Sequence, residues 1–135
     1  MKTTLITWIL RITASVILLQ TLYFKFTGAP ESIYIFSALG IEPYGRIGSG
    51  IAELIIAILI LIPKTTWPGA LGGCGVMTGA VLSHLFVLGI EVKNDGGFLF
   101  ALALITLSCC LGLLYLNKNK IINLLKINNH ADQIN

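Results

Sequence analysis

Three ionisable residues lie inside long apolar runs of the sequence, where an unpaired charge is costly: Arg11, Glu53 and His84. Lys25 and Arg46 lie at the edges of such runs. A glutamate and a histidine can hold or transfer a proton, whereas lysine and arginine attract an anionic or carbonyl-bearing ligand. These five residues are therefore our candidate binding pocket, and none is assigned a catalytic role. One histidine with one glutamate does not make a metal site, so no metal centre is predicted.

Helical spacing places these residues on shared faces. Steps of four and three residues link Arg46, Gly50 and Glu53, and His84 follows Ala80 by four. At a rise of 1.5 Å per residue, Glu53 lies about 10 Å and His84 about 6 Å from the same end of the molecule. We expect the small residues to leave room. The pattern thus predicts an outward-facing pocket with the two proton-carrying residues at its floor and two cations at its mouth.

The same charges also have a purely structural interpretation, in which they only hold helices together. Glu53 could form a buried ion pair with Arg11 or Lys25. We expect Arg11 and Glu53 to share one network, either directly or through Lys25 or water.

The composition is that of a membrane protein. Of 135 residues, 56% are hydrophobic and 11% are charged, whereas about 25% of the residues of a soluble domain are charged. The mean hydropathy is +0.88. The net charge of +3 is spread along the chain, which excludes a nucleic-acid-binding role. Three cysteines without a C-x-x-C motif fit no disulfide framework.

Four apolar runs predict four membrane-spanning helices, because about 20 residues are needed to cross a hydrocarbon core of about 30 Å. Their approximate ranges are 5-24, 47-62, 68-88 and 97-116. The second run is short and must borrow Tyr44–Arg46 or thin the bilayer locally. No alternation of period two competes with the helical pattern. We therefore predict an all-α fold, an integral membrane four-helix bundle over residues 1-117.

Two further segments lie outside the spans. A proline before and a glycine after Glu31–Leu39 predict a short helix at the membrane interface. Residues 118-135 form a cytoplasmic tail that is partly amphipathic. We expect Lys118–Ile127 to lie on the cytoplasmic leaflet and 128-135 to be disordered.

The lysines and arginines that flank the spans predict the orientation of the chain. The side that holds both termini carries five of them, whereas the opposite side carries three together with four acids. The more positive flanks of a membrane protein lie in the cytoplasm. We therefore expect both termini to be cytoplasmic and the loops 24-46 and 89-96 to lie outside.

Short motifs at these positions resemble those of the DoxX family, including the DoxX-like and MauE-like small membrane proteins. The motifs are the Phe24-Lys25-Phe26-Thr27-Gly28 end of the first helix, the Gly50-x-x-Glu53 opening of the second, Gly79-Ala80 with His84 in the third, and Asp95-Gly96-Gly97 before the fourth. The resemblance runs from Arg11 to about Phe100, and the ordered set is more specific than any one piece. It implies a four-helix bundle in the bacterial cytoplasmic (inner) membrane.

What the resemblance implies about function is mixed. Some family members are small subunits of systems for quinone-dependent oxidation of sulfur compounds, others belong to oxidative-stress complexes, and distant animal relatives look like assembly chaperones. Our first hypothesis is a small subunit or accessory of a quinone-linked membrane oxidoreductase. The chain has no haem-ligand pair and no iron–sulfur cysteines, so no cofactor is intrinsic. A quinone is then the expected ligand, and the lipid bilayer and an oxidoreductase subunit are the expected partners.

The alternative hypothesis is a non-enzymatic membrane scaffold, assembly factor or small-molecule binder, in which the charged residues form an ion-pair network. A homo-oligomer fits either hypothesis. Whether the chain is itself an enzyme stays open at this point, because fold transfers between family members more safely than activity does.

Overall fold

Four stretches of the chain are long and apolar enough to cross a membrane, which confirms the predicted all-α membrane bundle. They are Thr3–Thr27, Tyr44–Leu61, Pro63–Leu88 and Phe98–Leu116. The structure is a computed structural model that describes residues 2–134, and within these residues it contains helices and no strand. The chain is an integral membrane protein.

The long helices are joined by short elements. The helices are α1 (Lys2–Thr27), α2 (Pro30–Ala38), α3 (Tyr44–Leu61), α4 (Thr66–Ser83), α5 (Phe98–Leu116) and α6 (Lys118–Ile134), with a 3-10 turn η1 (Pro63–Thr65) and a π-helical turn η2 (His84–Leu88). The short second apolar run does borrow from the residues before it, because α3 begins at Tyr44. The predicted interfacial helix is α2.

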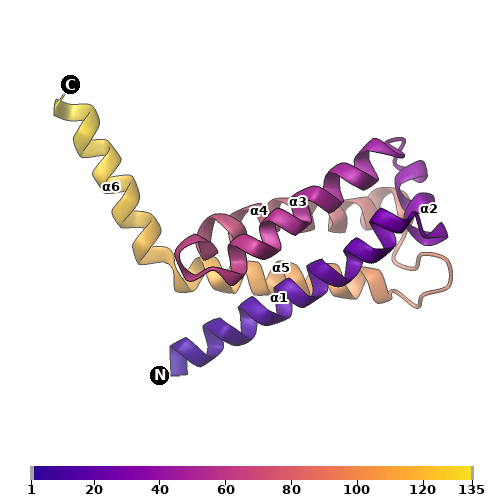
Figure 1. Cartoon of the computed structure of the whole chain (residues 1–135), viewed down its shortest axis with the longest axis horizontal. Helices are drawn as coiled ribbons and strands as arrows, with labels where there is room; N and C mark the ends of the chain where they lie inside the picture. Colours follow the sequence, from indigo (N-terminus) through magenta and orange to yellow (C-terminus); the bar gives the residue numbers. More distant parts are fainter. Residues whose placement is uncertain (1, 135) are drawn as a thin grey trace.

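Each helix of the bundle packs against two neighbours. The contacts join α1 to α3 and α5, and α4 to the same two helices, so α1 and α4 lie diagonally opposite each other. Figure 1 shows the N-terminus, η1 and the start of α6 at one end of the bundle, and α2 with the loop before α5 at the other. We call these the terminal end and the α2 end.

The bundle packs through small residues and turns large apolar side chains outward, as expected where lipid replaces water. A Cβ atom on Gly69 would lie only 2.8 Å from the backbone nitrogen of Ile60, and one on Gly73 would lie 2.6 Å from Cys110 Sγ. These glycines therefore let α4 approach α3 and α5 closely. Gly75 has nothing within 4 Å of its Cβ position in the part of the chain that the structure describes.

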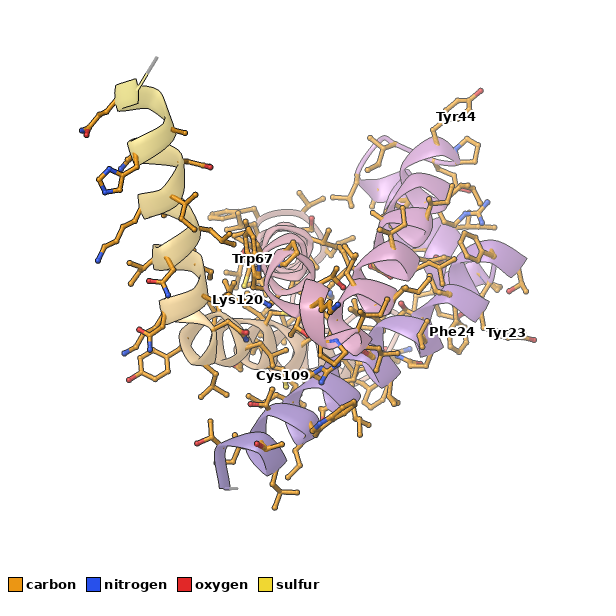
Figure 2. The ribbon with its side chains drawn as sticks, turned by 60° about the vertical axis from the view of Figure 1, so that its left-hand side comes forward. Tyr23, Phe24, Tyr44, Trp67, Cys109 and Lys120 are labelled. Carbon is orange, nitrogen blue, oxygen red and sulfur yellow. The ribbon has the colours of Figure 1, made fainter. Side chains whose placement is uncertain are left out.

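Exposed aromatic residues mark both ends of the bundle. Tyr23 and Tyr44 project outward near the α2 end, and Trp67, which is half-buried, lies near the start of α6 (Figure 2). Tyr44 is 87% exposed, and Tyr115, the penultimate residue of α5, is 65% exposed. Tyrosine and tryptophan are enriched where a membrane meets water. Their positions agree with a bundle that spans the membrane along its long axis.

The tail differs from its prediction. We expected disorder over 128-135, but α6 continues to Ile134, and Asn135 lies outside the described residues. The helix continues through this segment because the segment contains neither glycine nor proline, and so nothing in it strongly interrupts a helix.

Candidate functional site

A cavity of about 580 Å³ lies near the α2 end of the bundle. Its lining comes from α1, α2, α3, α4, η2 and α5 and is mostly apolar. Of the five predicted pocket residues, Lys25, Glu53 and His84 line it, whereas Arg11 and Arg46 do not. The structure thus brings together three of the five residues, and each comes from a different part of the bundle.

The first polar feature of the cavity is an ion pair between α1 and α3. Lys25 Nζ pairs with Glu53 Oε1, and Thr21 Oγ1 donates to Glu53 Oε2 at 2.8 Å. The Glu53 side chain is only 4% exposed and the Lys25 side chain 15%. Both carboxylate oxygens are therefore held by α1. Sequence reasoning missed Thr21, although it precedes Lys25 by four residues and so shares its helix face.

Arg46 lies beside the cavity and braces the same two helices. Its Nη1 donates to the backbone carbonyl of Lys25, and its Nε lies 2.8 and 3.1 Å from the two carboxylate oxygens of Glu42. Our placement of Arg46 at the mouth of the pocket is corrected accordingly. The reason is that Glu42 lies one helical turn before Arg46 and forms an ion pair with its guanidinium. The expected space at Gly50 is also filled, because the ring of Phe26 packs over it.

Arg11 lies at the other end of the bundle and does not reach Glu53. Its Nε donates to the Ile60 carbonyl at 2.8 Å, and its Nη2 donates to the Leu61 carbonyl. Its guanidinium also covers the Trp8 ring at 3.9 Å. The last carbonyls of a helix have no partner within that helix, and lipid supplies none. The Arg11–Glu53 network that we predicted is therefore absent from the described residues. The Arg11 guanidinium instead donates to carbonyls at the C-terminal end of α3, remote from Glu53.

Two threonines complete this helix end. Thr65 Oγ1 donates to the Leu59 carbonyl at 2.9 Å, and Thr66 Oγ1 lies 3.1 Å from the Ile60 carbonyl and 2.9 Å from the Ile62 carbonyl. With Arg11, these hydroxyls give a polar partner to each of the last carbonyls of α3 (Leu59–Ile62). Arg11, Thr65 and Thr66 thus have a structural role at this end of α3.

His84 is the first residue of η2 and is 5% exposed. Its Nδ1 lies 3.0 Å from the Gly89 carbonyl oxygen. Because a carbonyl can only accept, Nδ1 carries the proton of this hydrogen bond, and in the neutral ring Nε2 is an acceptor. Nε2 has no hydrogen-bond partner among residues 2–134. Single π-helical turns such as η2 are frequent at functional sites.

The loop after η2 forms one rim of the cavity and is organised by Asp95. The Asp95 carboxylate accepts backbone N–H groups of Val92 at 3.0 Å, Gly97 at 2.8 Å and Leu99 at 3.1 Å. Burial acts to raise the pKa of Asp95, but these three hydrogen bonds and the nearby His84 outweigh it, so the pKa lies below its ordinary value. Asp95 therefore fixes both this loop and the start of α5.

α2 covers the end of the cavity, a role that the sequence did not indicate. Its Ser32 and Phe36 are buried and line the cavity, and the Lys25 ammonium lies 5.7 Å from the centre of the Phe36 ring. Two lining residues, Phe24 on α1 and Phe98 on α5, are 46% and 60% exposed. The cavity therefore borders the lipid-facing surface through apolar side chains.

Comparison with known proteins places the bundle in a family. The DoxX family model matches residues 6–88, which is more than half of the chain and includes all five predicted pocket residues. The motif before α5 lies outside this match. No curated protein and no solved structure matches the chain. Because the family match extends from α1 to the end of η2, across all but one of the bundle helices, the chain belongs to the DoxX family.

Proposed function

We propose that this protein is a small subunit or accessory of a quinone-linked membrane oxidoreductase, and that its cavity binds the quinone headgroup. The observation that supports the proposal is the Lys25–Glu53 ion pair in the wall of an otherwise apolar cavity. The cavity volume of about 580 Å³ lies in the range of about 300–1,000 Å³ that is usual for small-molecule sites.

The polar groups of the cavity fit a ligand that carries a carbonyl in one state and a hydroxyl in the other. The Lys25 ammonium has three N–H donors, of which one goes to Glu53, so it can donate to a ligand carbonyl. His84 Nε2 can accept the proton of a ligand hydroxyl, because Nδ1 is the donor to Gly89. When bound, a quinone would supply electron-carrying capacity, with the electrons coming from a partner subunit.

The apolar lining fits the remainder of such a ligand. Phe24 and Phe98 both line the cavity and are partly exposed, so they offer an apolar surface to a hydrocarbon tail. A ligand that arrives from the bilayer needs an apolar route of this kind, because a charged passage would cost several kcal/mol.

We propose the predicted orientation as well, with both termini in the cytoplasm of a bacterial inner membrane. Lys64, Lys118, Lys120 and Lys126 belong to the terminal end, whereas Lys25, Arg46 and Lys93 at the α2 end are accompanied by Glu31, Glu42, Glu91 and Asp95. The excess of lysine at the terminal end favours the cytoplasm. The cavity would then face outward.

A second candidate function, a non-enzymatic membrane scaffold or assembly factor, is favoured by a different observation. Two of the cations at the α2 end are paired with acids, Lys25 with Glu53 and Arg46 with Glu42. The first pair can serve only to fasten α1 to α3, and the second only to fix the start of α3. In that case the cavity would hold ordinary lipid, and the outer surface would carry the function.

Quantifying the lipids that co-purify with the protein distinguishes the two candidates. We expect the full chain in mild detergent to retain quinone in stoichiometric amount, detected by mass spectrometry of the extracted lipids. The double variant Lys25→Gln/Glu53→Gln keeps hydrogen-bonding groups but removes both charges, and it should lose the quinone. A matched control, Lys64→Gln, changes a lysine at the terminal end and should retain it.

The result that would overturn the quinone proposal is a wild-type protein that carries phospholipid but no quinone when purified from quinone-containing membranes. A protein without quinone that is isolated in a tight complex with another membrane protein would support the scaffold instead. Equal quinone content in the wild type and in the double variant would show that the ligand lies outside this cavity.

A further inference from the structure

The last helix leaves the bundle at its terminal end, directly after the last membrane-spanning segment, Phe98–Leu116. α6 begins at Lys118, one residue beyond Asn117, the C-cap of α5. Tyr115 and Trp67 mark the membrane boundary at this end, and Lys118 Nζ lies 4.3 Å from the centre of the Tyr115 ring. Figure 1 shows α6 running away from the bundle at an angle to its long axis. Because α6 follows the last membrane-spanning helix directly, its first turns lie close to the end of the apolar bundle.

The first turns of α6 present an apolar face. Ile121, Ile122, Leu124 and Leu125 are spaced by one, three and four residues, which at about 100° per residue spans an arc of about 160°. Apart from the half-buried Ile121, these side chains are 42–59% exposed. Ile122, Leu124 and Leu125 are thus left exposed among the residues that the structure describes.

Lysines flank this apolar arc. By the same helical angle, Lys120 and Lys126 each lie about 40° beyond one of its two edges. None of the α6 lysines forms an ion pair with any side chain that the structure describes. Lys120 Nζ lies 3.5 Å from the backbone carbonyl of Lys64, so a fourth lysine belongs to the same end. Lysines on both borders of an apolar face can extend toward lipid headgroups while their methylene groups stay in the apolar layer.

We propose that α6 binds the anionic lipid headgroups of the leaflet at the terminal end, with its apolar face in the outermost hydrocarbon layer. The combination of an apolar arc, lysine borders and anchorage at the membrane boundary is that of an interfacial helix. A second copy of α6 is disfavoured as the occupant, because it would bring like-charged lysines together. This inference rests on residues remote from the cavity and is independent of the quinone proposal.

Hydrogen–deuterium exchange of the full chain in lipid nanodiscs tests the proposal. The comparison is between nanodiscs of phosphatidylcholine alone and nanodiscs of phosphatidylcholine mixed with phosphatidylglycerol. We expect the amides of α6 to exchange at least about tenfold more slowly in the anionic nanodiscs, because each lysine near an anionic surface contributes about 1 kcal/mol, or about fivefold. High salt should reverse most of this protection.

Two variants separate the roles of charge and helix. Lys118→Gln/Lys120→Gln/Lys126→Gln removes the charges but leaves helix propensity nearly unchanged, and it should abolish the difference between the two nanodiscs. The control Asn119→Gln/Asn123→Gln/Asn129→Gln alters the same number of polar positions and should keep the difference.

Three results would overturn the proposal. Equal protection in both nanodiscs would mean that α6 packs by apolar contacts alone, and rapid exchange in both would mean that it leaves the surface. Protection that appears only when each nanodisc holds two copies of the chain would assign α6 to a second copy. None of these results bears on the cavity, so the quinone experiment stays independent.

Discussion

Replacing Glu53 by leucine should destabilise the protein through the partners that the carboxylate leaves behind. Lys25 Nζ loses its acceptor, whereas Thr21 Oγ1 can still donate to the Leu18 carbonyl at 2.8 Å. The Lys25 side chain is only 15% exposed, so its ammonium regains little water in exchange. Removing one partner of a buried ion pair costs about 3–5 kcal/mol. Because Lys25 also borders a cavity that can admit water, we expect the lower part of this range, about 3 kcal/mol.

The chemistry of the replacement should set the size of the effect. Glu53→Gln keeps an amide oxygen for Thr21 or Lys25 and loses mainly the charge, so we expect a loss of about 1–2 kcal/mol. The double variant Lys25→Met/Glu53→Leu leaves no unpaired charge and should fall within about 1 kcal/mol of the wild type, because apolar groups can replace a buried ion pair. Lys25→Met alone should also cost about 3 kcal/mol, because it leaves the Glu53 carboxylate buried without its cation. The coupling energy of the cycle, which is the sum of the two single losses less the loss in the double variant, is then about 5 kcal/mol.

The assay is a reversible unfolding titration with sodium dodecyl sulfate in mixed micelles, followed by circular dichroism. Glu31→Gln is the control, since Glu31 is an exposed acid of the same end, and it should stay within about 0.5 kcal/mol of the wild type. If the two single losses simply add in the double variant, within about 0.5 kcal/mol, the ion pair does not stabilise the bundle and the reasoning fails.

Three other perturbations probe features away from the ion pair, with the same titration. Gly69→Ala should cost about 1–3 kcal/mol because its Cβ would meet the Ile60 backbone at 2.8 Å. Gly75→Ala lies in open space and should be neutral or stabilising by up to about 1 kcal/mol. Equal changes in stability for the two variants would contradict the close packing of α4 against α3. Arg11→Met strips donors from two α3 carbonyls and should cost about 2–4 kcal/mol, whereas an unchanged midpoint would show that other donors suffice. Because the pKa of Asp95 is lowered on folding, its stabilising effect is complete above its unfolded pKa of about 3.9 and is lost as pH falls through the lower folded value. Asp95→Asn should therefore weaken the acid dependence below about pH 4, and an identical pH profile would refute this role.

The fold could be predicted because membrane-spanning helices are specified by the run of apolar residues itself. Lipid forces each run to satisfy its own backbone hydrogen bonds, so length and composition predict both the number of helices and their ends to within a few residues. The end of α6 was harder to predict, because a polar tail without glycine or proline has no local signal that separates a helix from disorder.

The candidate site could be predicted only in part. Helical spacing correctly gathered Lys25, Glu53 and His84 around one end of the bundle, because depth and face follow from residue number. It could not choose partners for the two arginines. A guanidinium on a long side chain reaches in several directions, and both arginines donate to backbone carbonyls of another helix, which periodicity does not reveal. The Glu42 partner of Arg46, by contrast, lies at the i,i+4 spacing that the sequence does show.

The two ends of the α1–α3 pair are fastened in different ways, and this has a mechanical consequence. Arg11 secures one end and Lys25 the other, 14 residues apart in the sequence, or about 21 Å along α1. Helices pinned at two such points cannot slide or pivot past each other. At the α2 end, within residues 2–134, no side-chain hydrogen bond or ion pair joins α1 or α3 to α4 or α5. Any widening of the cavity would therefore have to move α4 and α5 relative to α1 and α3 and leave the α1–α3 pair unchanged.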